Sequence, residues 1–233
     1  MGAIYKKEMR SYFSYPLAYI FLAAFFAFSG FFFQYIFSMG STYMPLVFNM
    51  LFTCVLFTIF VLTMGSFSDE RRHKTDQALL TAPVSVTSIV LGKFFAALTV
   101  FSIGMVVTVL QAVVLSFFKQ PDWLLFLSCF LGLFLVGAVM IAIGMFISSL
   151  TESQIVAAVI TVAFAIVVTF IDTIANSIGW AWLTTAVTAV SLQARFAAFI
   201  VGQLDFSNII FFLSIATLAL YGTVRVVESK RWL

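Results

Sequence analysis

Charge is what this sequence has least of. Asp, Glu, Lys and Arg make up only 9% of its 233 residues, whereas soluble domains carry about 25%. That shortage excludes a soluble globular domain, because too few polar side chains are present to cover its surface. The chain also has only two cysteines and a net charge of +3. Together with the apolar composition, these values exclude a disulfide framework, a nucleic-acid-binding module and a disordered chain.

Apolar residues make up 63% of the chain and fall in long continuous runs. Six runs reach or approach the roughly 20 residues that a helix needs to cross a bilayer. None shows the short alternation that is typical of membrane β-barrels. We therefore predict an all-α integral membrane protein, folded as one transmembrane domain over residues 1–233. The predicted spans cover residues 17–37, 46–67, 89–118, 124–147, 154–171 and 208–227.

Lys and Arg are distributed unevenly among the segments that connect these runs. With the N-terminus inside, ten of the twelve lie in inner segments, and only Lys119 and Arg195 lie in outer ones. Because cations near span ends stay on the cytoplasmic side, this bias predicts that both termini are cytoplasmic. It also argues against a seventh span over 178–202, which would place Arg225 outside and bury Arg195 in lipid.

Residues 172–207 are then an external segment, with room for short helices that re-enter the outer leaflet. Trp180 and Trp182 lie in it, and tryptophans are typical of the membrane interface.

The residues before the first span have two faces. Tyr5, Met9, Tyr12 and Phe13 recur at helical spacing. The opposite face carries Lys6, Lys7, Arg10 and Ser14. This pattern predicts an amphipathic helix over residues 3–15 that lies on the inner membrane surface. A plain positively charged flank of the first span is the alternative.

The largest polar segment is the loop of residues 68–88, which contains both cations and carboxylates. This mixture is unlike a polybasic lipid-binding segment. Thr75 can cap a short helix that Pro83 ends, and Leu79 and Leu80 would then face outward. Exposed leucines within a polar rim suit a docking surface. An ordinary connecting loop with its leucines resting on the membrane fits the composition equally well.

Two features of the helical runs predict how the helices pack. Gln111 lies within the third run and is expected to form a hydrogen bond between helices. Small residues gather in the fourth run and predict close helix approach. They are Gly132, Gly137, Ala138, Ala142 and Gly144.

Chemistry-bearing motifs are scarce. The sequence contains no G-x-x-x-x-G-K-[ST] motif to hold nucleotide phosphates. Its only histidine is His73 in the polar loop, so no histidine-based metal site or catalytic triad can form within the chain. We therefore expect no enzyme activity, and no catalytic, cofactor-binding or metal-binding residues. The ionisable residues fall near span ends, as Lys93 does at the entrance of the third run, which disfavours a secondary transporter.

The loop sequence Glu70-Arg-Arg-His-Lys-Thr-Asp-Gln-Ala-Leu-Leu-Thr-Ala-Pro-Val-Ser, followed by Ile89-Val-Leu-Gly-Lys-Phe, resembles the first cytoplasmic loop of ABC-2 type permeases. These are membrane subunits of ATP-binding-cassette exporters. Many relatives have Gly and Glu where this chain has Lys74 and Gln77. Residues 5–13, 199–205 and 220–232 extend the resemblance, most closely to the gliding-motility-associated permease subunits.

The resemblance implies a six-helix subunit of a bacterial cytoplasmic membrane. Such a subunit pairs with a second permease, identical or different, and the neighbour can carry a large external domain. The pair binds two copies of a separate ATPase, and that partner holds ATP and Mg. Lipid is the other expected partner, and nucleic acid is not.

In this family the loop after the second span resembles a ball joint seated in the ATPase. We assign this ATPase-coupling interface to Asp69, Glu70, Arg71, Arg72, Thr75, Asp76, Leu79, Leu80 and Pro83, with Glu152 as a minor contact. A capped helix break is the alternative for the turn that holds Glu152.

The sequence thus predicts a permease subunit that exports an apolar or amphipathic substrate, driven by an ATPase docked on residues 69–81. Its substrate-binding residues are not assigned. A non-transporting scaffold or force-transmitting subunit of an ABC complex is the first alternative. A secondary transporter is the second.

Overall fold

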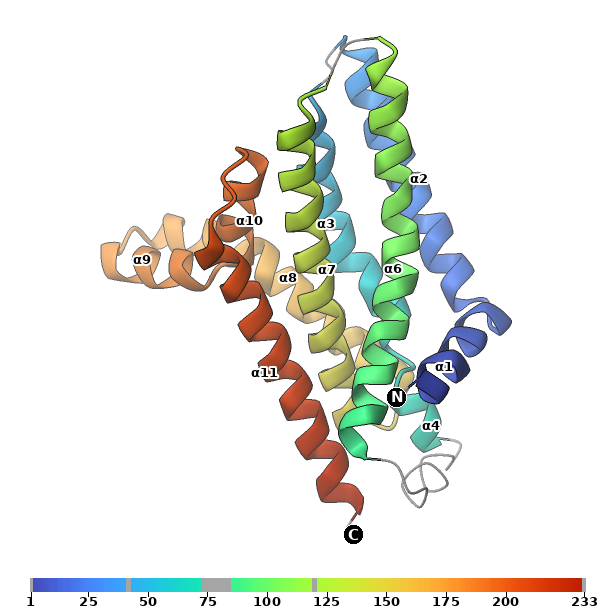
Figure 1. Cartoon of the computed structure of the whole chain (residues 1–233). Helices are drawn as coiled ribbons and strands as arrows, with labels where there is room; N and C mark the ends of the chain where they lie inside the picture. Colours follow the sequence, from blue (N-terminus) through green and yellow to red (C-terminus); the bar gives the residue numbers. More distant parts are fainter. Residues whose placement is uncertain (1, 41–42, 73–84, 119–120, 232–233) are drawn as a thin grey trace.

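The computed structural model describes residues 2–40, 43–72, 85–118 and 121–231, and all regular structure in these residues is helical (Figure 1). The helices are α1 (Gly2–Ser14), α2 (Leu17–Ser38), α3 (Met44–Thr63), α4 (Ser68–Arg72), α6 (Val86–Ser116), α7 (Trp123–Leu150), α8 (Gln154–Ile178), α9 (Ala181–Val190), α10 (Leu192–Ile200) and α11 (Phe206–Arg231).

Six of these helices are long and apolar enough to cross a membrane: α2, α3 with its continuation through α4, α6, α7, α8 and α11. The longest, α6, has 31 residues, which at 1.5 Å per residue is about 46 Å, more than the roughly 30 Å of a hydrocarbon core. The predicted all-α membrane fold with six spanning helices is confirmed. Most helix ends lie within four residues of the predicted ones.

The fifth long helix ends later than the predicted span. Helix α8 continues to Ile178, seven residues beyond 171, so Asp172 lies inside the helix instead of opening the external segment. The Ser191 hydroxyl donates a hydrogen bond to one oxygen of the Asp172 carboxylate. Helix α8 ends only at Gly179, whose positive φ of 74° is a left-handed cap that glycine adopts without strain.

The central helix is α7, which packs against α3, α6, α8, α10 and α11 (Figure 1). Its sequence is apolar on every side, as expected for a helix surrounded by others. Glycines let two neighbours come close. A Cβ atom on Gly137 would lie 2.2 Å from the Phe101 ring of α6, and one on Gly144 would lie 2.3 Å from the Thr63 hydroxyl of α3. The predicted close approach is confirmed at both positions.

The predicted hydrogen bond of Gln111 is also confirmed. The Ser29 hydroxyl of α2 donates to the Gln111 side-chain oxygen of α6 at 3.1 Å, and both residues are buried. An interhelical bond of this kind is worth about 0.6–2 kcal/mol in a membrane.

The predicted external segment contains two short helices, α9 and α10. In Figure 1, α9 extends sideways from the bundle. A polar network fixes the segment: Arg195 of α10 donates to Asn208 of α11 at 2.9 Å, and its guanidinium lies 5.0 Å from the centre of the Phe211 ring. Re-entry of these helices into a membrane stays a prediction.

We expect Gly137→Val and Gly144→Val each to lower the free energy of unfolding by about 1–3 kcal/mol, because the added side chain must displace Phe101 or Thr63. Thermal unfolding in detergent measures the effect. The matched control is Gly30→Ala: Gly30 is exposed on α2, and a Cβ atom added to it would meet nothing within 4 Å, so stability should stay equal or rise. Wild-type stability in both valine variants would refute the close packing around α7.

Candidate functional site

Helix α1 lies against the beginning of α6 (Figure 1). A Cβ atom on Gly92 would lie 2.9 Å from the Ile4 side chain, and the Tyr5 and Thr99 hydroxyls are 3.1 Å apart. The predicted polar face is exposed: Lys6, Lys7, Arg10 and Ser14. The predicted helix with two faces is therefore present, and its apolar face packs on the protein itself.

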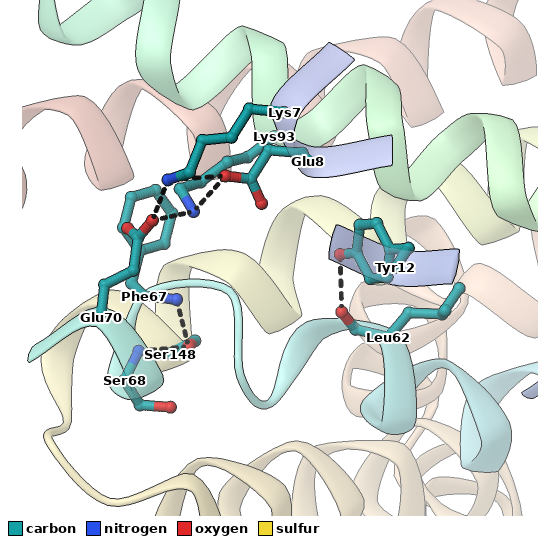
Figure 2. Close-up of polar contacts among 9 residues, drawn as sticks. All are labelled: Lys7, Glu8, Tyr12, Leu62, Phe67, Ser68, Glu70, Lys93 and Ser148. Atoms are coloured by element: carbon teal, nitrogen blue, oxygen red, sulfur yellow. Dashed lines mark hydrogen bonds and ion pairs between the residues drawn. The ribbon is translucent and has the colours of Figure 1, made fainter. Parts of the chain in front are cut away.

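Four charged side chains meet where α1, α4 and α6 come together (Figure 2). The ammonium of Lys93 lies 2.9 Å from the Glu70 carboxylate and 3.1 Å from the Glu8 carboxylate. The ammonium of Lys7 lies 3.1 Å from Glu70 and 3.5 Å from Glu8. We call Lys7, Glu8, Glu70 and Lys93 the charge cluster. It joins three helices that are far apart in the sequence.

Burial makes the pairs of Lys93 costly to break. Its side chain is 2% exposed, compared with 11% for Glu8, 17% for Glu70 and 54% for Lys7. The Lys93 ammonium also lies 5.2 Å from the centre of the Phe67 ring, a cation–π contact. Taking a charge out of water costs several kcal/mol, and only close partners offset it. Lys93 therefore holds α1 and α4 against α6.

A second set of bonds fixes the turn between α3 and α4. The buried Ser148 hydroxyl of α7 accepts hydrogen bonds from the backbone N–H groups of Phe67 at 3.1 Å and Ser68 at 3.2 Å (Figure 2). The same hydroxyl donates to the Met64 carbonyl at 3.1 Å. These bonds satisfy backbone groups that the end of α3 and the start of α4 leave open. The base of the polar loop is thus anchored on the central helix.

Tyr12 fastens α1 to the end of α3. Its hydroxyl donates to the Leu62 carbonyl at 2.9 Å (Figure 2). Burial raises the pKa of Tyr12 far above its ordinary value, because the phenolate would lose its water. The phenol therefore stays neutral and keeps its proton for this bond.

A cleft of about 610 Å³ opens beside the charge cluster, between α1 and the α3–α4 turn. The whole cluster lines it, together with Tyr12, Tyr15, Ser66 and Gln154 among others. Gln154 reaches it from the start of α8, where its side-chain amide lies so close to Gly65 that a Cβ atom there would be 2.9 Å away. Polar groups of α1, α4 and α8 thus border one opening.

The structure describes part of the predicted ATPase-coupling interface. Arg72 is exposed on α4, Asp69 and Arg71 are partly buried there, and Glu152 is exposed in the turn between α7 and α8. Since α4 contacts α7 and α8, the predicted minor contact adjoins the base of the loop. The remaining assigned residues lie outside the described part of the chain: Thr75, Asp76, Leu79, Leu80 and Pro83.

Glu70 has a role that the sequence reasoning missed. The sequence assigns it to the ATPase interface, but its carboxylate is turned inward to Lys7 and Lys93. Glu8 has no role in that assignment, and Lys93 enters it only as a cation at the entrance of a span. One signal was available: Glu8 falls on the same helical face as Tyr5 and Tyr12, where a carboxylate needs a buried partner.

Comparison with known protein families identifies the family of this chain. The model of the ABC-2 family transporter protein matches residues 26–231. This chain belongs to the ABC-2 transporter family. The comparison with curated proteins found no match. Membership makes the chain a multi-pass membrane permease of an ABC transporter and implies partnership with an ABC ATPase. The finer resemblance to gliding-motility-associated permease subunits stays a prediction.

We expect Lys93→Met to destabilise this ABC-2 permease by about 3–5 kcal/mol, because it leaves the Glu8 and Glu70 carboxylates facing each other without their buried cation. The matched control is Lys7→Met, which removes the half-exposed cation from the same carboxylates and should cost less than about 1 kcal/mol. Thermal unfolding of the purified permease compares the two. Equal losses would show that Lys93 is not the centre of the cluster.

Proposed function

We propose that this chain is the permease subunit of an ABC-2 exporter that moves an apolar or amphipathic substrate outward. A separate ATPase, which binds ATP and Mg, drives it by docking on residues 69–81. The observation that carries the proposal is the charge cluster, because it ties the base of this loop to α1 and α6. Family membership supports the partnership with an ATPase.

The cluster gives the loop a direct mechanical connection to the bundle. A shift of α4 moves the Glu70 carboxylate, and the 2.9 Å pair carries that shift to Lys93 near the beginning of α6. The Glu8–Lys93 pair carries it on to α1. Because α6 is a continuous helix of 31 residues, a tilt at its inner end reaches its outer end. The hydrogen bonds of Ser148 keep the α3–α4 turn in place during this movement.

The distribution of charge assigns sides to the membrane. The excess of cations on the α4 side favours a cytoplasmic location for that end, within reach of a soluble ATPase, and the family resemblance implies a bacterial membrane. Helices α9 and α10 then lie outside and re-enter the outer leaflet. A second permease, identical or different, completes the transporter.

A force-transmitting subunit without transport would use the same connection. The two functions differ in flux: an exporter moves labelled lipid-like cargo in proteoliposomes that contain all subunits and ATP, while a force-transmitting subunit shows ATP hydrolysis without flux.

Replacing Leu79 and Leu80 together by Asp tests the docking site. Loss of an apolar anchor at an interface costs about 2 kcal/mol or more, so we expect the affinity for the ATPase to fall at least about thirty-fold. Co-purification of the ATPase with the tagged permease measures it. The matched control is Leu204→Asp, an exposed leucine in the outer turn before α11, which should leave the ATPase bound. If the double variant keeps as much ATPase as the wild type, docking on these leucines is wrong.

A further inference from the structure

A second groove lies between the beginning of α6 and the end of α11. It has a volume of about 430 Å³. Its walls are apolar: Val90 and Leu91 from α6, and Leu220 and Val224 from α11. Both helices are candidates to span the membrane. The groove lies at the end of the bundle where α6 begins and α11 ends.

The cation Arg225 lies at the polar end of this groove. Arg225 donates from Nε to the Tyr221 hydroxyl at 2.8 Å, and its guanidinium lies 5.1 Å from the centre of the same ring. Its Nη1 atom is 3.6 Å from the Glu228 carboxylate. The Arg225 side chain nevertheless remains 64% exposed. The ring and hydroxyl of Tyr221 therefore hold the guanidinium beside the groove, and other N–H groups of the guanidinium remain accessible to a ligand.

The local charge favours an anion at this end. Residues 225–231 contain three cations, Arg225, Lys230 and Arg231, against one carboxylate, Glu228. The distribution of Lys and Arg over the whole chain assigns this end to the inner leaflet, where anionic lipids attract basic segments that flank a span. A guanidinium is also well suited to phosphate, since it offers two parallel N–H donors.

We propose that this groove binds one anionic phospholipid of the inner leaflet. An acyl chain lies along Val90, Leu91, Leu220 and Val224, and the phosphate accepts hydrogen bonds from Arg225. The lipid fills the space between α6 and α11 and so stabilises the position of the beginning of α6. This site goes beyond the proposed function and does not depend on where the ATPase docks.

The test is retention of lipid by the full-length chain purified in detergent, with phosphatidylglycerol or phosphatidylcholine added and counted by native mass spectrometry. We expect the wild type to retain phosphatidylglycerol in preference to phosphatidylcholine. Arg225→Gln should reduce that retention about tenfold. The matched variant is Glu228→Gln: it breaks the same ion pair but keeps the cation, so retention should stay equal or rise.

A further variant tests the groove itself. Val224→Trp fills the space while keeping Arg225, and it should also reduce retention. If a variant does not fold, the wild-type protein still decides, because phosphatidylglycerol should raise its unfolding temperature more than phosphatidylcholine does.

Three results would overturn the proposal. The first is equal retention of the two lipids by the wild type. The second is a loss with Glu228→Gln as large as that with Arg225→Gln, which would mean that the ion pair only maintains structure. The third is a Val224→Trp variant that keeps its lipid but loses its oligomeric state, which would assign the groove to a second permease.

Discussion

A buried lysine ammonium fixes the arrangement of this permease at its α4 end. Lys93 is almost inaccessible to water, so it needs anionic partners, and α6 itself places none beside it. Helix α1 supplies Glu8 and helix α4 supplies Glu70. Because neither helix can move away without leaving Lys93 short of a partner, the requirement of one side chain determines where two other elements lie. Further hydrogen bonds hold these elements in place. The Tyr12–Leu62 bond joins α1 to α3, and the bonds of Ser148 join the α3–α4 turn to α7.

Such a cluster is unusual in a chain with only 21 charged residues. Replacing a buried ion pair by apolar side chains is often neutral or stabilising, so stability alone does not account for it. Ion pairs also define the relative positions of helices, whereas apolar contacts alone would allow the helices to slide past one another. The proposed transfer of a displacement from the polar loop to a membrane helix would use this kind of connection. The cleft beside the cluster leaves room for that displacement.

The fold could be predicted from the sequence because its main signal is simple. A run of about 20 apolar residues has few structures open to it in lipid, and six such runs gave six helices. The end of α8 was missed because Asp172 looks like an end of a span, and its partner Ser191 is 19 residues away. The two faces of α1 were predicted from their spacing. The sequence did not predict whether the apolar face of α1 contacts lipid or protein, since both surfaces are apolar.

The charge cluster could not be predicted in the same way. Its partners lie 63 and 85 residues apart, and one sequence does not say which distant charges meet. The two lysines looked ordinary: Lys7 as part of a basic flank, Lys93 as a cation near a span end. Residues 73–81 of the loop to which we assign ATPase docking lie outside the described structure, so the helix expected there remains a sequence-based prediction. What the structure adds is the set of ion pairs that joins the base of that loop to α1 and α6.

Glu70→Gln examined in the assembled transporter tests this connection most directly, because the substitution removes the negative charge with which α4 binds Lys93 and Lys7 while leaving the Glu8–Lys93 pair in place. Spin labels at Phe117 and Ser177, exposed near the outer ends of α6 and α8, would report the distance between these helices without nucleotide and with ATP, in a background with Cys54 and Cys129 replaced by Ala. We predict an ATP-dependent change in the wild type that is lost in Glu70→Gln although the ATPase remains bound, and kept in the control Glu228→Gln, which removes a carboxylate of α11 that lies outside the charge cluster and outside the assigned ATPase interface. The same change in Glu70→Gln as in the wild type would contradict the account.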